Sequence, residues 1–181
     1  LGGGWSWTKV ATTTGILLNT KPLNLSFRIN QNNVSPSYQL TPQDLYFAQC
    51  GVSVKELTDR LGNHGRSIKT SGASNGQTIA GAMSTGTHGA AIDIGSIADF
   101  VVALHIIVSP TDQIWLERKS YRVASDSFVG ALHATPVRDD DLFNAAIVAF
   151  GSFGFIHGVM IESAPLFLYE AHRFRVPLND N

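Results

Sequence analysis

Three glycine-rich stretches are the parts of this sequence best suited to hold a ligand. They span residues 2–7, 71–89 and 151–154. Glycine has no Cβ, so a phosphate group can come close to the backbone N–H groups of such loops. The sequence therefore favours a nucleotide or dinucleotide ligand that is bound mainly by main chain.

The common nucleotide-binding fingerprints do not fit these stretches. Residues 2–7 lack the third glycine of G-x-G-x-x-G, and no strand precedes them in the sequence. Residues 81–86 have the glycine spacing of a Walker loop, but Thr87 and His88 stand where lysine and serine or threonine belong. We therefore expect neither a Rossmann dinucleotide site nor a nucleotide-hydrolysing P-loop.

A serine-hydrolase pattern overlaps the second stretch. Residues 72–76 match G-x-S-x-G around Ser74, and Asp99 and His157 follow in the order Ser, acid, His. So short a pattern arises often in a chain rich in glycine and serine. A serine hydrolase that uses Ser74 is one alternative function, and a non-catalytic nucleotide-binding module is another.

The histidines do not form a metal-binding pattern. They show no i, i+4 pair and no pairing with cysteine, so no metal is expected. His105 lies inside an apolar run and is expected to be a hydrogen-bonded structural residue. The six positions are His64, His88, His105, His133, His157 and His172.

Periodicity in the first half of the chain places the elements that would position these loops. Residues 15–18 could form the end of a strand, and the mostly polar residues 19–42 predict a long surface excursion. Residues 45–50 predict a buried strand. Ser53 and Glu56 have capping-box spacing at the start of a helix, and Gly62 or Gly65 would end it. The apolar residues at helical spacing are Val54, Leu57 and Leu61.

The second half of the chain adds strands and two more helices. A small helix is expected over residues 78–84, after a short strand-like piece at residues 67–71. Residues 101–108 and 114–116 predict a hairpin, and residues 155–161 predict a further strand. Asp139 to Asp141 begin a helix that Gly151 would end, with one face formed by Leu142, Ala145, Ala146 and Ala149. Mixed strands and helices indicate an α+β or α/β domain.

Composition excludes several function classes. The 181 residues carry a net charge of -1, so there is no basic surface for nucleic acid. One cysteine, Cys50, cannot form an internal disulfide. No apolar run reaches the roughly 20 residues that span a bilayer, so we expect a soluble protein, with the cytoplasm favoured as its compartment.

Only 15% of the residues are charged, against about 25% in a typical domain, which indicates that some surface is covered. Leu1 opens directly onto three glycines without an initiator methionine or a leader. We interpret the chain as a fragment whose missing partner is the rest of the protein.

Taken in order, the glycine-rich stretches resemble one family of flavoproteins. The relevant segments are residues 2–7, Q-T-I-A-G at 77–81, T-G-T-H-G at 85–89 and G-x-x-G at 151–154. They resemble the FAD-binding domain shared by vanillyl-alcohol oxidase and p-cresol methylhydroxylase (PCMH type). Within this family the chain is most similar to sugar-alcohol and aldonolactone oxidases.

The resemblance implies a fold, a cofactor and an activity. The fold would be an α+β PCMH-type FAD-binding domain over residues 1–181, incomplete at its N-terminus, with an antiparallel or mixed sheet flanked by helices. The activity would be the oxidation of a hydroxylated small molecule, such as a sugar alcohol or aldonolactone, by hydride transfer to flavin. The substrate domain would be absent from the chain, so this part alone is expected to bind FAD weakly and to turn over nothing.

The resemblance also implies which residues contact FAD. The first wall around the pyrophosphate would be Gly2, Gly3, Gly4, Trp5 and Ser6, and the second Gln77, Thr78, Gly81, Ala82, Thr85, Thr87 and Gly89. Ser71, Gly72, Ala73 and Ser74 would lie beside the isoalloxazine ring, and Gly154 and Ile156 would present backbone to the adenine. No catalytic residue is assigned, because the family's base comes mostly from the second domain.

The chain departs from the family in two ways. Many relatives carry a histidine covalently bonded to the flavin where this chain has Trp5, whose indole has no nucleophilic nitrogen. Cys50 lies on the wrong segment for the cysteinyl link of other relatives, so the FAD is expected to be non-covalent. Residues 24–42 and 119–138 would be insertions of unassigned role.

Overall fold

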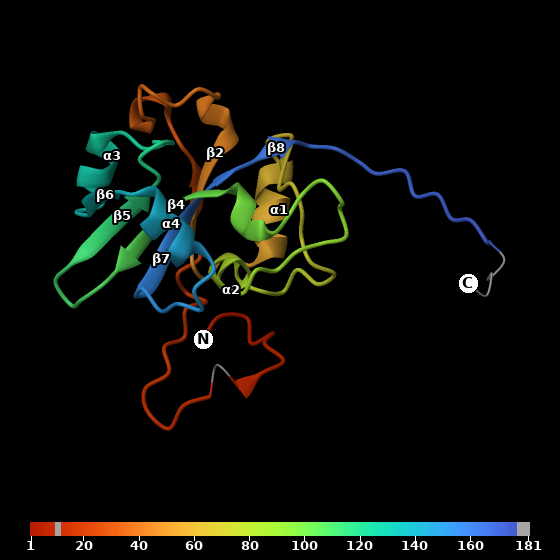
Figure 1. Cartoon of the computed structure of the whole chain (residues 1–181), viewed down its shortest axis with the longest axis horizontal. Coiled ribbons are helices and arrows are strands. Elements are labelled where there is room, and N and C mark those ends of the chain that lie inside the picture. Colours follow the sequence, from red (N-terminus) through yellow and green to blue (C-terminus); the bar gives the residue numbers. More distant parts are fainter. Residues whose placement is uncertain (10–11, 177–181) are drawn as a thin grey trace.

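A six-stranded mixed sheet forms the centre of the molecule (Figure 1). The computed structural model describes residues 1–9 and 12–176. The strand order is β1-β2-β7-β4-β5-β6, and neighbours are antiparallel except for the parallel pair β5 and β6. The strands are β1 (Ser26–Arg28), β2 (Leu45–Gln49), β4 (Val101–Ile107), β5 (Gln113–Glu117), β6 (Thr135–Arg138) and β7 (Phe155–Glu162). A separate two-stranded sheet pairs β3 (Arg66–Ser67) with β8 (Ala164–Pro165).

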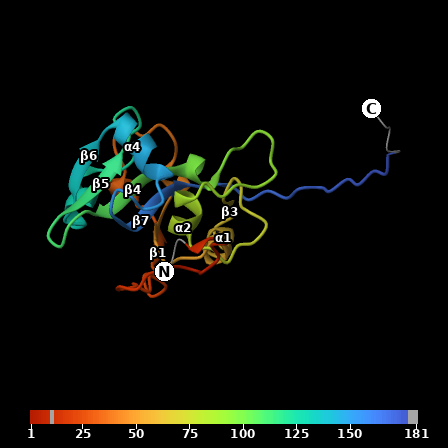
Figure 2. The same cartoon turned by 60° about the horizontal axis from the view of Figure 1, so that its bottom comes forward.

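Helices pack on both faces of the large sheet. They are α1 (Val54–Gly62), α2 (Ile79–Ser84), α3 (Asp126–Ala131) and α4 (Asp140–Ile147). Single 3₁₀ turns lie at Gln31–Asn33, Pro42–Asp44 and Ile97–Phe100. Figures 1 and 2 show residues 1–9 and 12–20 below the sheet and residues 166–176 running away from it as an extended, exposed chain. No helix among the described residues has the length and apolar character needed to cross a membrane.

The predicted start and buried face of α1 are confirmed. Ser53 Oγ accepts a hydrogen bond from the Glu56 amide at 3.1 Å, and the Glu56 carboxylate accepts one from the Ser53 amide at 2.8 Å. These hydrogen bonds lower the pKa of Glu56. The predicted apolar residues Val54, Leu57 and Leu61 are buried. After the helix, Gly65 takes the left-handed conformation, with φ of 67°.

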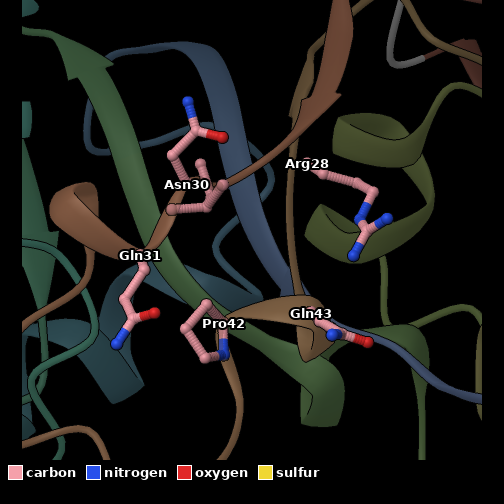
Figure 3. Close-up of a pocket in the computed structure, with 6 residues that line it drawn as sticks. Arg28, Asn30, Gln31, Pro42 and Gln43 are labelled. Atoms are coloured by element: carbon pink, nitrogen blue, oxygen red, sulfur yellow. The ribbon is translucent and has the colours of Figure 1, made fainter.

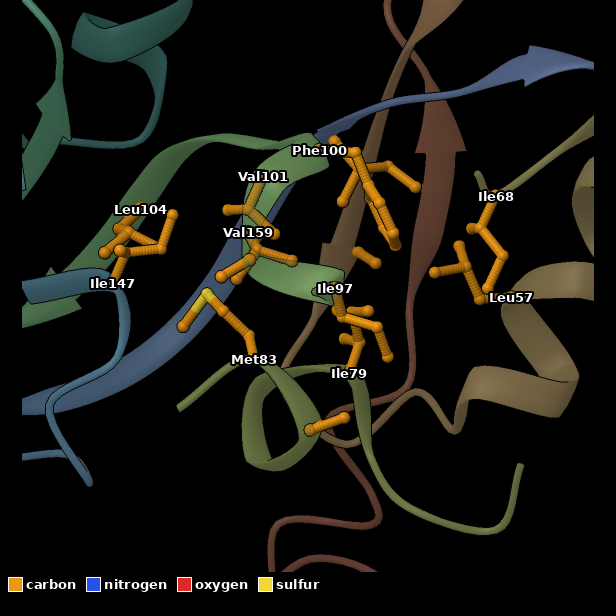
Figure 4. Packing of buried hydrophobic residues seen from close by; sticks show 14 of the residues in the cluster. Leu57, Ile68, Ile79, Met83, Ile97, Phe100, Val101, Leu104, Ile147 and Val159 are labelled. Carbon is orange, nitrogen blue, oxygen red and sulfur yellow. The ribbon is translucent and has the colours of Figure 1, made fainter. Parts of the chain in front are cut away.

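The larger hydrophobic core lies between the sheet and helices α1, α2 and α4. Figure 4 shows Ile79 and Met83 of α2 pointing toward Ile97 and Val159. Met83 and Val159 are fully buried. This core fixes α2, the small helix that follows the second glycine-rich stretch, against the middle of the sheet.

The opposite face carries a second core, which the two predicted insertions build together. The Ser35 amide donates to the Val123 carbonyl at 2.9 Å, and the Ser125 amide donates to the Asn33 carbonyl at 2.9 Å. Phe128 of α3 packs edge-to-face on Trp115 of β5, with ring centroids 5.3 Å apart. Residues 24–42 and 119–138 therefore cover one face of the sheet and stabilise it.

Two tyrosines join these segments to β7. Tyr38 and Tyr121 both donate hydrogen bonds to the buried carboxylate of Glu162, and their rings meet edge-to-face. Burial and the Glu162 carboxylate raise the pKa of both tyrosines, so both hydroxyls remain protonated donors.

Several local expectations were wrong. Residues 15–18 form no strand, and Ile16 is 90% exposed. The supposed surface excursion over residues 19–42 contains β1, which pairs with β2, and Ile29 is buried. The short strand lies at Arg66–Ser67 rather than at residues 67–71. At β1 and β3 the pairing with a distant strand overrode the local composition.

The predicted buried face of α4 was right for Ala146 and for Leu142, which packs against the core, and wrong for Ala145. Phe143, Ala146 and Ile147 are buried, whereas Ala145 is exposed. The helix ends at Ile147, four residues before Gly151. Phe143 and Ile147 bury more apolar area than the alanines, so the helix turns their side to the sheet.

Glu117 joins β5 and the edge strand β6 to the second core. Its side chain is fully buried, with Oε1 accepting from Arg138 Nε at 3.0 Å. Its Oε2 accepts from the amides of Val123 and Ala124 at 3.0 and 3.1 Å. Arg138 also pairs with the exposed carboxylate of Asp126. The parallel edge strand β6 is thus tied to the segment that precedes α3.

We predict that Glu117→Ala lowers the free energy of unfolding by about 3 kcal/mol, measured by urea denaturation. The change leaves Arg138 and two buried amides without their acceptor. Asp126→Ala is the matched control, because it removes an exposed carboxylate from the same arginine. Solvent and salt screen such a pair, so its loss is expected to be much smaller. Equal losses in the two variants would contradict the stabilising role of the buried carboxylate.

Candidate functional site

The N-terminal glycine loop runs against residues 76–78 at very short range. A Cβ on Gly2 would lie 2.5 Å from Oγ1 of Thr78, and a Cβ on Gly3 would overlap the carbonyl oxygen of Gly76. A Cβ on Gly76 would in turn overlap the indole of Trp5. Any larger residue would push the two segments apart, so the glycines are required by this close approach.

Residues 75–79 are held in place by backbone hydrogen bonds to the start of α1. The Val54 and Lys55 amides donate to the carbonyls of Gln77 and Asn75 at 2.8 and 2.9 Å. The Ile79 amide donates to the Val52 carbonyl at 2.8 Å. The capped helix α1 therefore provides a rigid support for the second glycine-rich stretch.

The two segments enclose a cavity of about 460 Å³. One side is formed by residues 1–8 and the other by residues 77–87, with Phe150 reaching in from the third stretch. The Phe150 amide donates to the Ser84 carbonyl at 3.2 Å, which holds this loop on the end of α2. The lining residues outside the N-terminal loop are Gln77, Thr78, Gly81, Thr85, Thr87 and Phe150.

This cavity offers neutral hydrogen-bonding groups and no charge. None of its lining residues is acidic or basic. None of the amides of Gly2 to Ser6 donates a hydrogen bond to an acceptor among the described residues. The buried Oε1 of Gln77 also has no partner there. A buried polar atom is normally satisfied, so Oε1 of Gln77 fits a ligand that donates the missing hydrogen bond. The half-buried or exposed amides of Gly2 to Ser6 are free to donate to such a ligand.

Two adjoining hollows extend the cavity into a trough along residues 71–78. A hollow of about 710 Å³ shares Gly3, Trp5 and Thr78 with the first cavity and is also lined by Lys21 and Lys55. A further hollow of about 540 Å³ shares Asn75 with it and reaches Ser71 and Gly89. The buried Oδ1 of Asn75 has no partner among the described residues. The trough suits an elongated ligand.

The structure brings together most of the site residues expected from the resemblance. Those that line the first cavity are Gly2, Gly3, Gly4, Trp5, Ser6, Gln77, Thr78, Gly81, Thr85 and Thr87. Ser71 and Gly89 line the far end of the trough, and Gly72 lies against Thr87. Ala82 is buried in the core, and Ala73 and Ser74 are exposed.

Gly154 and Ile156 lie at the start of β7, outside the lining of the first cavity. Gly154 has φ of 130° and packs against the Ile107 carbonyl. The adenine-binding role of Gly154 and Ile156 stays a prediction.

The first cavity is also lined by four residues that were not among the predicted site residues. They are Leu1, Trp7, Thr8 and Phe150. All four lie within or next to a glycine-rich stretch, and this position in the sequence could have identified them as lining residues.

The hydrolase pattern has no assembled triad among the described residues. Asp99 accepts a hydrogen bond from the Ser96 amide at 2.7 Å, where it caps a 3₁₀ turn. His157 bonds to Gln49 and His105, and no hydrogen bond joins it to Ser74. Residues 1–9 and 12–176 contain no group of three or more His, Cys, Asp or Glu side chains placed to hold a metal ion.

A separate hollow of about 470 Å³ lies at the end of the sheet opposite the N-terminal loop. Figure 3 shows the polar side chains of Arg28, Asn30, Gln31 and Gln43 around it, with Pro42. It shares no lining residue with the trough.

Comparison with known protein families identifies the domain. Residues 1–115 match the family model described as an FAD binding domain. The chain belongs to this family. FAD is therefore the cofactor of the domain, and the predicted resemblance and fold class are confirmed.

Several similar proteins are lactone oxidases by name, and the similar proteins of Mycobacterium tuberculosis are L-gulono-1,4-lactone dehydrogenases. The chain is 30% identical to a putative D-arabinono-1,4-lactone oxidase of Neurospora crassa, over 68% of this chain and 19% of that protein. It is 26% identical to the L-gulonolactone oxidase of Mus musculus, over 92% of this chain and 32% of that protein. The chain thus spans about a fifth to a third of such relatives.

Solved structures share the fold. The carbohydrate oxidase of Microdochium nivale has a TM-score of 0.67 at 16% identity and covers 91% of this chain, which covers 30% of that chain. A cholesterol oxidase of Brevibacterium sterolicum has a TM-score of 0.64 at 18% identity, over 91% of this chain and 29% of that chain.

We predict that Gly76→Ala weakens FAD binding by at least about tenfold, equivalent to about 1.4 kcal/mol. The added methyl group would displace the Trp5 indole and open the contact between the two walls. Fluorescence titration with FAD measures the Kd. Gly62→Ala is the matched control, because a Cβ there meets nothing within 4 Å and the affinity should not change. An unchanged Kd for Gly76→Ala would contradict the predicted role of this contact.

Proposed function

We propose that this chain is the FAD-binding part of an oxidoreductase that acts on a hydroxylated small molecule, such as a sugar alcohol or aldonolactone. The observation that carries the proposal is the first cavity, between residues 1–8 and residues 77–87, which no acidic or basic side chain lines, in a chain of the FAD-binding family. The names of the relatives, which include lactone oxidases from a fungus and a mammal, support the substrate class.

In this proposal the diphosphate of FAD lies between the two glycine-rich walls. The amides of Gly2 to Ser6 would donate to it from one side, and the hydroxyl groups of Thr78 and Thr87 would donate to it from the other. The Thr85 hydroxyl already donates to the Gly81 carbonyl at 2.9 Å, so Thr85 would line the site without donating to the phosphate. Backbone amides can hold a phosphate without a basic side chain. This mode of binding is consistent with a first cavity that has no charged lining residue.

The ring systems would occupy the two ends of the trough. Ser71 to Ser74 and Gly89 would lie toward the isoalloxazine, and Gly154 and Ile156 toward the adenine. Phe150 supports the second placement, because it brings the third glycine stretch to the cavity. Ala82 would act by packing α2 in the core rather than by contact with the cofactor.

Bound FAD would supply the redox chemistry, as acceptor of a hydride from a carbon that carries a hydroxyl group. The residues of this chain would bind the cofactor, orient it and exclude water from its diphosphate. We assign no catalytic base here. We propose that residues 1–181 form a truncated PCMH-type domain, and that a substrate domain of the same protein supplies the base and covers the flavin.

We predict that the FAD is bound without a covalent link. Trp5 lines the first cavity, and its indole ring has no nucleophilic nitrogen. Acid precipitation of the full-length protein should release the yellow colour into the supernatant. Colour that remains with the pellet would show that another residue forms the bond.

The oxidoreductase activity is tested by flavin reduction. In a protein that joins this chain to its substrate domain, an aldonolactone or polyol should bleach the visible flavin absorbance under anaerobic conditions. Residues 1–181 alone should bind FAD but leave it oxidised. Bound flavin that no such substrate reduces would instead favour a non-catalytic nucleotide-binding module.

A further inference from the structure

A chain of side-chain hydrogen bonds crosses four neighbouring strands of the sheet. Gln49 of β2 bonds to His157 of β7 at 3.1 Å between their Nε2 atoms. The Nδ1 atoms of His157 and His105 of β4 lie 2.9 Å apart. His105 Nε2 then lies 2.9 Å from Oε1 of Gln113 on β5. The Leu25 amide extends the chain beyond β2, because it donates to Gln49 Oε1 at 2.9 Å.

The Leu25 amide determines the direction of every bond in this chain. A backbone N–H can only donate, so it must face the oxygen of the Gln49 amide, and the Gln49 NH₂ group must donate to His157 Nε2. His157 then carries its proton on Nδ1 and donates it to His105 Nδ1. His105 in turn carries its proton on Nε2 and donates it to Gln113. Both imidazoles are therefore neutral, with opposite tautomers.

We propose that the His105–His157 pair is a pH-sensitive clasp that holds residues 19–25 beside the candidate FAD trough. The neutral pair carries two ring protons, one on each histidine. A third proton would set one N–H group against another, either between the two rings or between His157 and Gln49, unless the hydrogen bonds on the Gln49 side reverse. Reversal turns the Gln49 amide, so that its NH₂ group faces the Leu25 N–H and that hydrogen bond is lost. One proton on the histidines would thus release the backbone amide of Leu25, the residue just before β1.

Residues 19–25 lie beside the trough. Lys21 and Asn24 line its middle hollow, and the Gly51 amide donates to the Leu23 carbonyl at 2.8 Å. The Thr20 amide donates to the Leu1 carbonyl at 3.1 Å, which connects this segment to the start of the first glycine loop. Loss of the Leu25 N–H bond in acid would loosen this side of the site. The segment would then be held next to β2 by the Gln49 backbone amide, which donates to the Leu25 carbonyl at 2.9 Å, and by the Gly51 amide.

The surroundings of the pair favour the neutral state. Among the described residues no charged side chain bonds to either ring, and the neighbours on β2 and β5 are the neutral Gln49 and Gln113. Asp112, next to Gln113 in the chain, is exposed and bonds to Ser109 and Thr111. Cys50, whose amide donates to the His157 carbonyl, is buried, and burial raises the pKa of its thiol to about 11.

Burial lowers the pKa of both histidines, and their mutual proximity lowers that of His105 further. The unfolded chain therefore binds protons at a higher pH than the folded one. Stability is fully present above the ordinary histidine pKa of about 6.5 and falls as the pH drops through that value.

The test is a pH titration of the chain by nitrogen-15 NMR, with amide hydrogen exchange measured alongside. At about pH 7.5 the imidazole protons should be on Nδ1 of His157 and Nε2 of His105. At about pH 5, exchange of the Leu25 amide, corrected for its intrinsic rate, should rise about tenfold as the pair titrates. Other tautomers, or a Leu25 amide that stays protected while the pair takes up a proton, would overturn the proposal.

Gln49→Glu is the informative variant. A carboxylate can accept hydrogen bonds from the Leu25 amide and from a protonated His157 at the same time. The histidine pair should therefore take up its proton at higher pH, and the Leu25 amide should stay protected from hydrogen exchange. His64→Gln removes an exposed histidine and should leave the titration unchanged. The wild-type titration decides the question even if Gln49→Glu does not fold. These readouts need no FAD, so they stand apart from the proposed function.

Discussion

Contact between two glycine-rich stretches of main chain, residues 2–5 and residues 76–78, is the constraint on which the candidate FAD trough depends. Gly2 and Gly3 approach Thr78 and Gly76 so closely that a methyl group on either would overlap its neighbour. The same approach leaves backbone amides of the N-terminal loop without acceptors among the described residues. A site formed in this way binds an anion through dipoles and needs no charged side chain.

The sheet and its helices hold one of these stretches fixed. Residues 75–79 bond to the start of α1, and α2 is packed by Ile79 and Met83 into the larger core. The N-terminal loop has fewer such supports, since its anchors are Leu1, paired with Leu18 and Thr20, and the contact between Trp5 and Gly76. The site therefore combines a rigid wall with one that can adjust to a ligand.

The cores on the two faces of the sheet have different roles. One face carries the core that supports the trough. The other carries a second core in which the buried carboxylates of Glu117 and Glu162 are satisfied by amides, arginine and tyrosine hydroxyls. Most of the charge that this weakly charged chain places inside the protein is thus used for structure, and the first cavity of the candidate site stays neutral.

The sequence by itself determined the elements whose signals are local. The capping box of Ser53 and Glu56, the apolar runs of β2, β4 and β7, and the order of the glycine stretches all depend on neighbours within a few residues. Only the tertiary structure decided what depends on distant partners. The packing of residues 24–42 on residues 119–138 and the entry of Phe150 into the cavity are of this kind. So is the Gln49–His157 bond, which joins residues 108 positions apart. Strand pairing brings such residues together. The sequence around a residue does not determine which distant residue the sheet places beside it.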